Sequence, residues 1–297
     1  MSSAKTPPGN AMDTMSKRLV IVLVTLAVTM LAVNIVRRHA PHAKMKDNHE
    51  FGGLMYQVLG LIYGVYLAFT IIAVWEQFGD ADKTATNEAT HLSELWRDAQ
   101  VFPASSRTLV QDKLYTYTKN VVDKEWPNMA VGKGAEATTA NSYEDLWNAY
   151  YAVPTATNDP KQAAFYEQSI HELNELGMLR RLRMLEATAA LPSLMWGLLL
   201  GGGAVTIAFM FVFGTRVAAT QYAVTGVVST MLVFSILMVG ALEHPFQGDV
   251  SIKPDAFSSV LQSMDQRLAR QRTDSTLSAP TVGQAGTAGK ASAKKLR

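Results

Sequence analysis

The sequence contains no cysteine, which excludes disulfides, thiolate chemistry and metal sites ligated by cysteine. It also lacks the phosphate loop, the dinucleotide fingerprint, the nucleophile elbow and the zinc-protease motif. The triple glycine at 201–203 lies inside an apolar run, which is the wrong context for a phosphate cradle. No segment shows the period-two alternation that is typical of strands. The sequence therefore predicts an all-α protein that is not an enzyme and holds no cofactor.

Charged residues are also absent from four long apolar runs, which cover residues 19–36, 51–75, 187–215 and 217–242. A helix of about 20 apolar residues matches the ~30 Å hydrocarbon core of a bilayer. The runs therefore predict an integral membrane protein with four transmembrane helices that contact lipid. Proton-coupled carriers usually need an ionisable side chain at mid-membrane, so the absence of Asp, Glu, Lys and Arg from the runs disfavours that class.

Polar segments surround these runs and differ in charge. Residues 76–186 carry 11 Lys and Arg against 17 Asp and Glu, a net charge of −6. Residues 265–297 carry 7 against 2, a net charge of +5, without the interleaved aromatic residues of a nucleic-acid-binding segment. The predicted domains are a disordered N-terminus (1–16), transmembrane helices one and two (17–75), a helical extramembrane insert (76–186), transmembrane helices three and four (187–245), a juxtamembrane segment (246–264) and a disordered basic tail (265–297).

The insert is predicted to be a helical extension of the membrane bundle. Apolar residues recur at spacings of three and four beyond the second run, so its helix should leave the membrane and continue to Pro103. Asp159 and Pro160 form an N-cap and first-position pair that opens a long helix. That helix is expected to run through Arg183 into the third run. Pro192 marks either a helix N-terminus or a kink.

The membrane orientation is predicted from Lys and Arg near the ends of the runs. If both termini and the insert share one side, that side has eight such residues and the other side has five, including Lys44, Lys46 and Arg216. The count favours a cytoplasmic insert with cytoplasmic termini, although the basic loop after the first run argues the other way. The tight link between the last two runs falls near Thr215 and Arg216.

Small residues at four-residue spacing suggest close helix packing. Such residues let two helix backbones approach closely, and the candidates are Gly60, Gly64 and Ala68 in the second run and Gly197 and Gly201 in the third. One interpretation is packing within the subunit. The other is that the second run lines the central axis of an oligomer and forms a hydrophobic-aromatic constriction. The pore-lining candidates are then Tyr56, Tyr63, Tyr66, Phe69 and Thr70.

Two clusters of histidine and glutamate contain residue types that bind metals. Glu88 and His91 have the Glu-x-x-His spacing of di-iron bundles, with Glu94 one turn further on. The second cluster has Glu-x-x-x-His spacing instead, between Glu167 and His171, and continues with Glu172 and Glu175. Such clusters are more typical of solvated faces of amphipathic helices. The sequence therefore predicts no metal site.

Several motifs, in order along the chain, resemble the bestrophin-like bacterial membrane family. Tyr63-Gly-Val-Tyr-Leu-Ala-Phe69 runs into Trp75-Glu-Gln-Phe78. The match continues through Asn87-Glu-Ala89, Leu95-Trp-Arg97, Glu125-Trp126 with Met129, the Arg180–Arg183 cluster, Pro192 with Trp196, and Pro245-Phe246-x-Gly248. The resemblance covers roughly residues 15–260, which is everything except the tails.

The resemblance implies a fold and a function, because bestrophins are pentameric anion channels with four spans and a cytoplasmic helical domain. We therefore expect a homo-oligomeric channel for inorganic ions in the bacterial inner membrane. The second transmembrane helix would line the pore, and the insert would form a vestibule. No acidic calcium-clasp run is identifiable. The net charge of the insert favours cations, whereas the bestrophin analogy favours anions, so the ion stays open.

The resemblance also singles out polar residues of the insert and its membrane edge. They are Glu76, Glu88, Arg97, Glu125 and Arg183. We expect most of them to form buried salt bridges that orient the insert helices, with a position at the pore mouth as the other interpretation. An alternative function is a membrane-anchored oligomeric scaffold or sensor whose insert binds a partner without conduction. A membrane enzyme with a metal in the insert is the third hypothesis.

Overall fold

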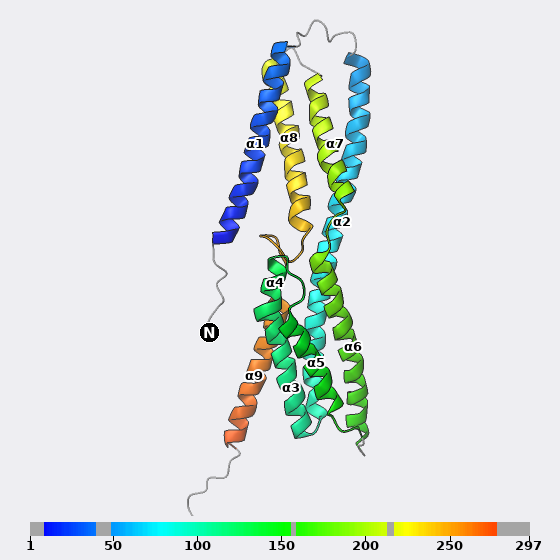
Figure 1. Ribbon diagram of the computed structural model, residues 1–297, viewed down its shortest axis with the longest axis vertical. Helices are drawn as coiled ribbons and strands as arrows, with labels where there is room; N and C mark the ends of the chain where they lie inside the picture. The colour runs from blue at the N-terminus through cyan, green and yellow to red at the C-terminus, as the bar shows by residue number, and fades with distance from the viewer. Residues whose placement is uncertain (1–8, 40–48, 156–158, 213–216, 278–297) are drawn as a thin grey trace, which may run out of the picture.

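A computed structural model describes residues 9–39, 49–155, 159–212 and 217–277, and every regular element within these ranges is helical (Figure 1). The α-helices are α1 (Gly9–His39), α2 (His49–Asp98), α3 (Ala104–Asn120), α4 (Trp126–Ala130), α5 (Ala137–Tyr151), α6 (Pro160–Thr188), α7 (Ser193–Val212), α8 (Ala218–Leu242) and α9 (Asp255–Leu277). A short 3₁₀ turn, Ala99–Val101, and a π-helical turn, Val121–Glu125, lie between them. The all-α prediction is confirmed for the described residues.

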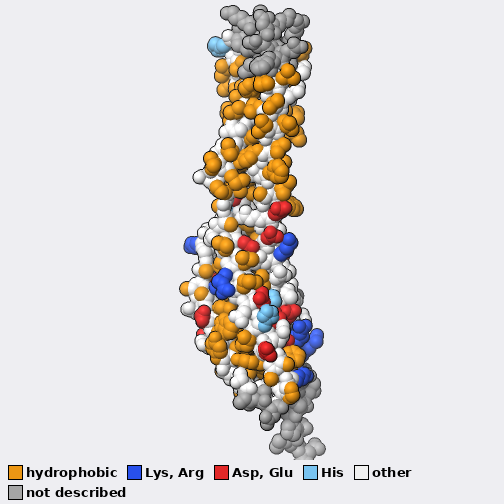
Figure 2. All heavy atoms as spheres, turned by 90° about the vertical axis from the view of Figure 1, so that its right-hand side faces the viewer, with side chains coloured by type: hydrophobic (Ala, Val, Ile, Leu, Met, Phe, Trp, Pro, Cys, Tyr) orange, Lys and Arg blue, Asp and Glu red, His pale blue; other side chains and the backbone are white. Residues whose placement is uncertain are grey.

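Four helices are long and apolar enough to cross a membrane: α1, the first half of α2, α7 and α8. Hydrophobic side chains cover the upper half of the face in Figure 2, whereas charged side chains gather on the lower half. The N-terminal end of α1 and the whole of α9 lie toward the insert end of the bundle (Figure 1). The prediction of four apolar helices that can cross a membrane is therefore confirmed, and α3 to α6 lie between the second and the third of them in the chain.

Helix α2 joins the membrane part to the insert without a break. Its 50 residues make a rod of about 75 Å at 1.5 Å per residue. The predicted continuity on the other side is wrong, because α6 ends at Thr188 and α7 begins at Ser193. The Pro192 carbonyl accepts the first hydrogen bonds of α7. The membrane part and the insert are therefore connected by one continuous helix, α2, and by one interrupted connection between α6 and α7.

A single carboxylate at the end of α8 holds the joint between α6 and α7. The Oε1 atom of Glu243 accepts a hydrogen bond from the Leu191 backbone N–H at 2.8 Å and one from the Trp196 indole N–H at 2.9 Å. Glu243 is itself buried. Because a buried carboxylate needs such donors, this contact fixes the end of α8 to the start of α7.

Parts of both segments that the sequence predicts to be disordered are helical. Helix α1 begins at Gly9 and α9 extends to Leu277, so residues 9–16 and 265–277 are helical. The Phe257 and Met264 side chains of α9 are buried in the insert core, which stabilises the helix. The juxtamembrane segment thus contains the first part of α9. Residues 1–8 and 278–297, the Lys44–Lys46 loop and the Thr215–Arg216 link lie outside the described residues.

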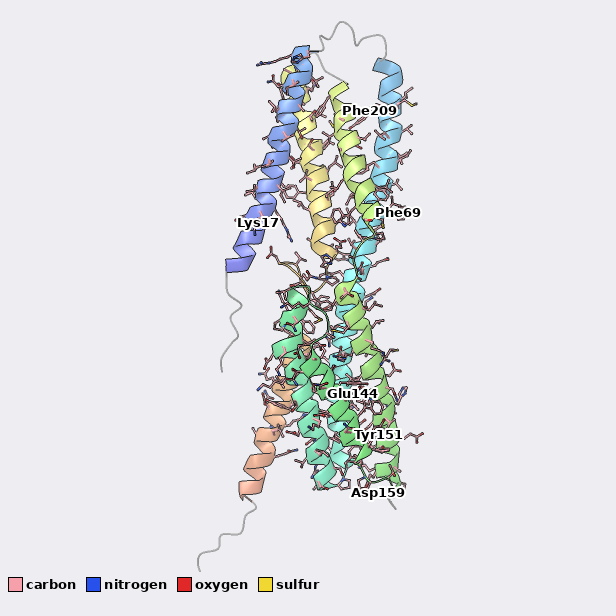
Figure 3. The ribbon with its side chains drawn as sticks, in the orientation of Figure 1. Lys17, Phe69, Glu144, Tyr151, Asp159 and Phe209 are labelled. Carbon is pink, nitrogen blue, oxygen red and sulfur yellow. The ribbon has the colours of Figure 1, made fainter. Side chains whose placement is uncertain are left out.

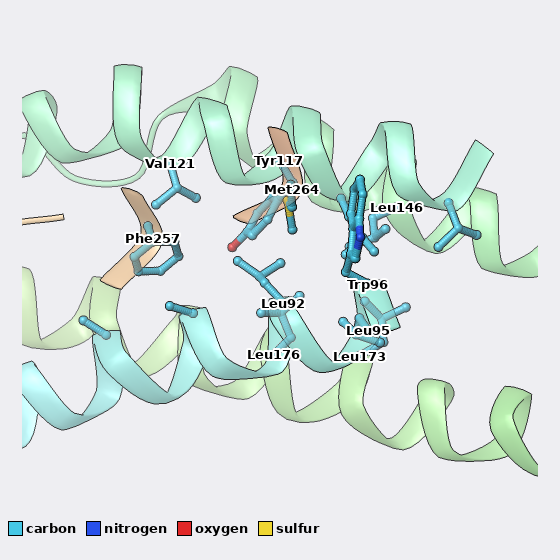
Figure 4. Packing of buried hydrophobic residues seen from close by; sticks show 14 of the residues in the cluster. Leu92, Leu95, Trp96, Tyr117, Val121, Leu146, Leu173, Leu176, Phe257 and Met264 are labelled. Carbon is cyan, nitrogen blue, oxygen red and sulfur yellow. The ribbon is translucent and has the colours of Figure 1, made fainter. Parts of the chain in front are cut away.

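The insert has a core of its own, formed where α2 and α6 pack against α3, α5 and α9. Leu92 and Trp96 of α2 meet Leu173 of α6, while Tyr117 of α3 and Leu146 of α5 close the opposite side (Figure 4). Burial of large apolar and aromatic side chains is the main stabilising contribution in such a core. The insert is therefore a packed helical domain that shares α2 with the membrane part.

The membrane part is held together by aromatic contacts between α2 and α7. The Tyr63 hydroxyl donates a hydrogen bond to the Leu199 carbonyl at 2.9 Å, and the Tyr66 hydroxyl donates one to the Met195 carbonyl at 2.8 Å. A Cβ atom at Gly202 would lie 2.5 Å from the Tyr63 ring, and one at Gly203 would lie 2.9 Å from the Tyr63 hydroxyl oxygen. The two glycines therefore form the notch that receives Tyr63.

Replacing Gly202 by alanine is expected to destabilise the packing of α2 on α7. The added Cβ atom would lie 2.5 Å from the Tyr63 ring, and overpacking of this kind typically costs about 1–3 kcal/mol. The neighbouring Gly201→Ala is the matched control, because a Cβ atom there meets nothing within 4 Å and the gain in helix propensity is the same. Thermal unfolding in detergent should show a lower midpoint for Gly202→Ala alone. Equal midpoints would contradict the notch.

Candidate functional site

The first candidate site is the face of α2 that points away from α7 and α8. Phe69, labelled in Figure 3, is 68% exposed and Val65 is 47% exposed. Leu61 and Ile72 share this exposure, and they recur with Val65 at spacings of four and seven, which places them on one side of a helix. An apolar helix face of this kind fits either lipid or a neighbouring subunit.

The structure divides the predicted pore-lining residues between two faces. Tyr63 and Thr70 are buried, and Tyr66 is partly buried with its hydroxyl bonded to α7. Tyr56 stacks on Phe209 of α7 with ring centroids 6.3 Å apart. These four side chains have their contacts within the subunit, and their position at a pore stays a prediction. Phe69 alone of the predicted set lies on the exposed face.

The predicted packing glycines face outward. A Cβ atom at Gly60, Gly64, Gly197 or Gly201 would meet no other atom of the described chain within 4 Å, and Ala68 is exposed. Packing within the subunit therefore does not account for these small residues. Gly202 and Gly203, which the sequence interpretation passed over as packing residues, form the close contact instead. Their adjacency to the Gly197 and Gly201 stripe was the available signal.

The second candidate site is a buried charge cluster in the insert. Arg183 of α6 donates from Nε to Glu88 Oε2 at 2.6 Å and from Nη2 to Glu88 Oε1 at 3.1 Å. The same Nη2 donates to Glu125 Oε2 at 3.2 Å. Glu88, Glu125 and Arg183 are all 0% exposed. Three residues that lie far apart in sequence are thus joined in one bidentate and one bridging ion pair.

Two further residues complete the cluster. Arg180 Nη2 donates to Glu125 Oε1 at 2.9 Å, and the Tyr117 hydroxyl donates to Glu88 Oε1 at 2.7 Å. Two carboxylates therefore face two guanidinium groups. Buried charges are tolerated only when they are paired and hydrogen-bonded in this way. The cluster connects α2, α3 and α6 with the π-helical turn.

The π-helical turn Val121–Glu125 positions Glu125 at its last residue. Such a turn inserts one extra residue into a helix and rotates the side chains that follow it. Trp126 comes next, and the Arg183 guanidinium lies 5.5 Å from its ring centroid and 5.5 Å from that of Phe257. Helix α9 therefore supplies an aromatic wall to the cluster.

The charges of the cluster reinforce one another. Burial alone would lower the pKa of Arg183, but Glu88 and then Glu125 raise it well above its ordinary value. Burial raises the pKa of Tyr117, and the Glu88 charge raises it further. The arginine is therefore permanently charged and the phenol permanently neutral. Neither Arg183 nor Tyr117 therefore titrates near neutral pH. This is the behaviour of residues in a structural network.

The structure places the remaining two family-motif residues on the surface. Glu76 is exposed near the membrane edge of α2, and the Arg97 side chain is 67% exposed with its Nε atom 4.0 Å from Asp98 Oδ1. Glu76 and Arg97 are therefore the two of the five that form no buried salt bridge in the described chain. Glu88, Glu125 and Arg183 are brought together in the buried cluster.

A comparison with protein families connects these features to known proteins. The model of the bestrophin-like domain matches residues 23–257. The match begins within α1 and ends within α9, so it includes the membrane helices and the insert. No curated protein matches the chain.

Solved structures with the same fold were also found. A crystal structure of a bacterial bestrophin homologue from Klebsiella pneumoniae with a point mutation has a TM-score of 0.65 at 14% identity, covering 83% of this chain and 98% of that one. A second mutant of that homologue has a TM-score of 0.63 at 14% identity, covering 82% and 98%. A mutant described only as a membrane protein has a TM-score of 0.64 at 14% identity, covering 82% and 97%. At this identity the similarity establishes the fold.

Proposed function

The chain belongs to the bestrophin-like family, and on that premise we propose that it is a homo-oligomeric ion channel whose pore is lined by α2. The observation that carries the proposal is the outward face of α2, where small residues and apolar residues are exposed on a helix that also spans the insert. A ring of such helices around an axis would give a pore with an apolar constriction. The insert would then surround the pore as a vestibule.

Two stripes of α2 fit opposite sides of a ring contact. Gly60, Gly64 and Ala68 make one flank of the exposed face small, whereas Ile62 and Phe69 make the other flank bulky. In a closed ring each subunit presents one surface to the neighbour on its left and a different one to the neighbour on its right. The small flank of one subunit would receive the bulky flank of the next. Leu61, Val65 and Ile72 would then face the pore.

The buried charge cluster would serve this channel by fixing the insert to the pore helix. Glu88 lies on α2, and its two hydrogen bonds to Arg183 hold α6 against it. Because α2 is continuous from the membrane to the insert, a displacement of the insert is transmitted to the pore face. We place the insert and both termini in the cytoplasm and the protein in the bacterial inner membrane. The selected ion is left open.

The test is ion flux through purified protein in liposomes, measured for monovalent cations and for anions separately. Conduction of either class supports the proposal, and the ratio gives the selectivity. The oligomeric mass in detergent and the symmetry of the particle are measured on the same preparation. Absence of flux at all tested pH values, voltages and calcium concentrations would move the assignment to a scaffold or sensor whose insert binds a partner.

Replacing Val65 by serine is expected to raise the flux severalfold. An apolar constriction blocks ions by dewetting, and a ring of hydroxyl groups would hold water in it. The control is Tyr63→Phe, which removes only a hydroxyl that is bonded inside the subunit to Leu199 and should leave the flux unchanged. Phe69→Ala tests whether the bulky flank of the same face contributes to the flux. A Val65→Ser variant that conducts like the unmodified protein would exclude this position from the constriction.

A further inference from the structure

A second polar cluster lies between α2 and α6, separate from the charge cluster of Arg183. The two predicted histidine-glutamate motifs each contribute to it. His91 Nδ1 contacts Glu172 Oε2 and lies 3.7 Å from Glu94 Oε2. One ligand-type atom from each of the three residues lies within 4.8 Å of the other two. Gln168 Nε2 donates a hydrogen bond to the second oxygen of Glu172, which orients that carboxylate.

This cluster is short of positive charge. Asp98 follows Glu94 by one helical turn, and its side chain is only 6% exposed. In the described part of the chain, the ion pairs of these carboxylates are with His91, which is charged only when protonated, and with the largely exposed Arg97. The cluster of Arg183 has two guanidinium groups for two carboxylates. Here three carboxylates share one exposed arginine and one histidine.

The electrostatics of Asp98 reflect this deficit. Burial raises its pKa, the Arg97 charge lowers it, and the charges of Glu172 and Glu94 raise it again. Carboxylates that are close together and partly withdrawn from water repel one another unless a cation lies between them. A bound cation would remove this repulsion.

Two buried hydroxyl groups lie on the helices next to this cluster. Ser169 lies one turn before Glu172 on α6, Tyr150 lies on α5, and both residues are 0% exposed. Burial raises the pKa of Tyr150, a hydrogen bond with the Ser169 side chain lowers it, and the Asp98 charge raises it. The two hydroxyls therefore interact with each other and bring no positive charge to the carboxylates.

We propose that His91, Glu94 and Glu172 bind one divalent transition-metal ion, with Zn²⁺ as the best match, and that the ion links α2 to α6. Imidazole nitrogen and carboxylate oxygen are ligands that Zn²⁺ prefers, whereas Mg²⁺ and Ca²⁺ favour sites made of oxygen alone. Asp98 adds negative charge beside the ion. His91 and Glu94 lie near the C-terminal end of α2, the helix that continues into the membrane.

The test is Zn²⁺ binding to the full chain in detergent after chelator treatment and dialysis. Isothermal titration should give one Zn²⁺ per chain, and saturating Zn²⁺ should raise the unfolding temperature by roughly 5–10 °C. Mn²⁺ should bind more weakly, in the order expected for nitrogen and oxygen ligands. Mg²⁺ and Ca²⁺ at the same concentration should leave the unfolding temperature unchanged.

Variants locate the ion. His91→Ala should weaken Zn²⁺ binding by about 100-fold or more, because losing even an outer partner of a ligand costs 10–100-fold. Glu94→Gln keeps the size of a partly exposed side chain and serves if His91→Ala does not fold. His171→Ala removes an exposed histidine of α6 outside the cluster and should bind Zn²⁺ as the unmodified chain does. The proposal would be overturned if the unmodified chain bound no Zn²⁺. It would also be overturned if His91→Ala and Glu94→Gln both bound Zn²⁺ as tightly as the unmodified chain.

Discussion

Replacing Arg183 by methionine is expected to lower the stability of the insert by about 3–5 kcal/mol, because it leaves buried charges without their partner. Glu88 would lose both of its guanidinium hydrogen bonds and Glu125 would lose one of its two. Methionine fills a similar volume, so loss of packing is a small part of the effect. A change of this size is a large fraction of the total stability of a domain.

The measurement is thermal or denaturant unfolding followed by circular dichroism in detergent. Arg181→Met is the matched control, because Arg181 lies two residues away on α6 with an exposed side chain, and surface substitutions usually change stability by less than about 0.5 kcal/mol. Adding Glu88→Gln to Arg183→Met should restore part of the loss, since it removes one unpaired charge. If Arg183→Met were as stable as Arg181→Met, water would have to reach the Glu88 and Glu125 carboxylates.

The membrane part was the more predictable half of the fold. Four uncharged runs predicted four helices, because the thickness of the bilayer fixes how many consecutive apolar residues a spanning helix needs. The division of faces within a helix was harder to predict. Tyr63 is an aromatic residue in an apolar run, and both a pore and a packed interior accommodate it. Only the register of α2 against α7 shows that Gly202 and Gly203 receive its ring.

The buried cluster shows a second limit of sequence interpretation. Family resemblance drew attention to Glu88, Glu125 and Arg183, but their pairing spans up to 95 positions, and no local spacing encodes it. The same motif set included Arg97, which is largely exposed. Residues that recur in a motif therefore differ in role, and burial decides which of them carry the ion pairs.

Composition was the weakest guide at the C-terminal end. Residues after 265 are rich in small polar and basic residues, which is typical of disorder. The helical spacing of Phe257, Val260, Met264 and Leu268 was the opposing signal, and all four contact the insert core. Tertiary packing of an amphipathic face outweighs unfavourable composition. The pairing of His91 with Glu172 of α6 was likewise not predicted, because the two residues belong to different helices and to two separate sequence clusters.

Replacing Gly64 by leucine is expected to dissociate the oligomer and abolish ion flux while leaving the subunit folded. Within the described chain, a Cβ atom at Gly64 meets nothing within 4 Å, so the subunit has room for the side chain. Leucine is also the better helix former. If the small flank formed by Gly60, Gly64 and Ala68 contacts a neighbouring subunit, the added bulk prevents the close approach of the two backbones that such a contact needs.

The two effects separate cleanly in one experiment. The mass of the protein–detergent complex reports assembly, and circular dichroism with thermal unfolding reports the fold of the subunit. Ala223→Leu adds bulk at another exposed small residue, on α8, and should leave the mass and the flux unchanged. A Gly64→Leu protein that keeps the full oligomeric mass and conducts normally would remove the small flank from the subunit interface. The pore would then have to be assigned to another helix, because a helix whose exposed face meets only lipid cannot line a pore between subunits.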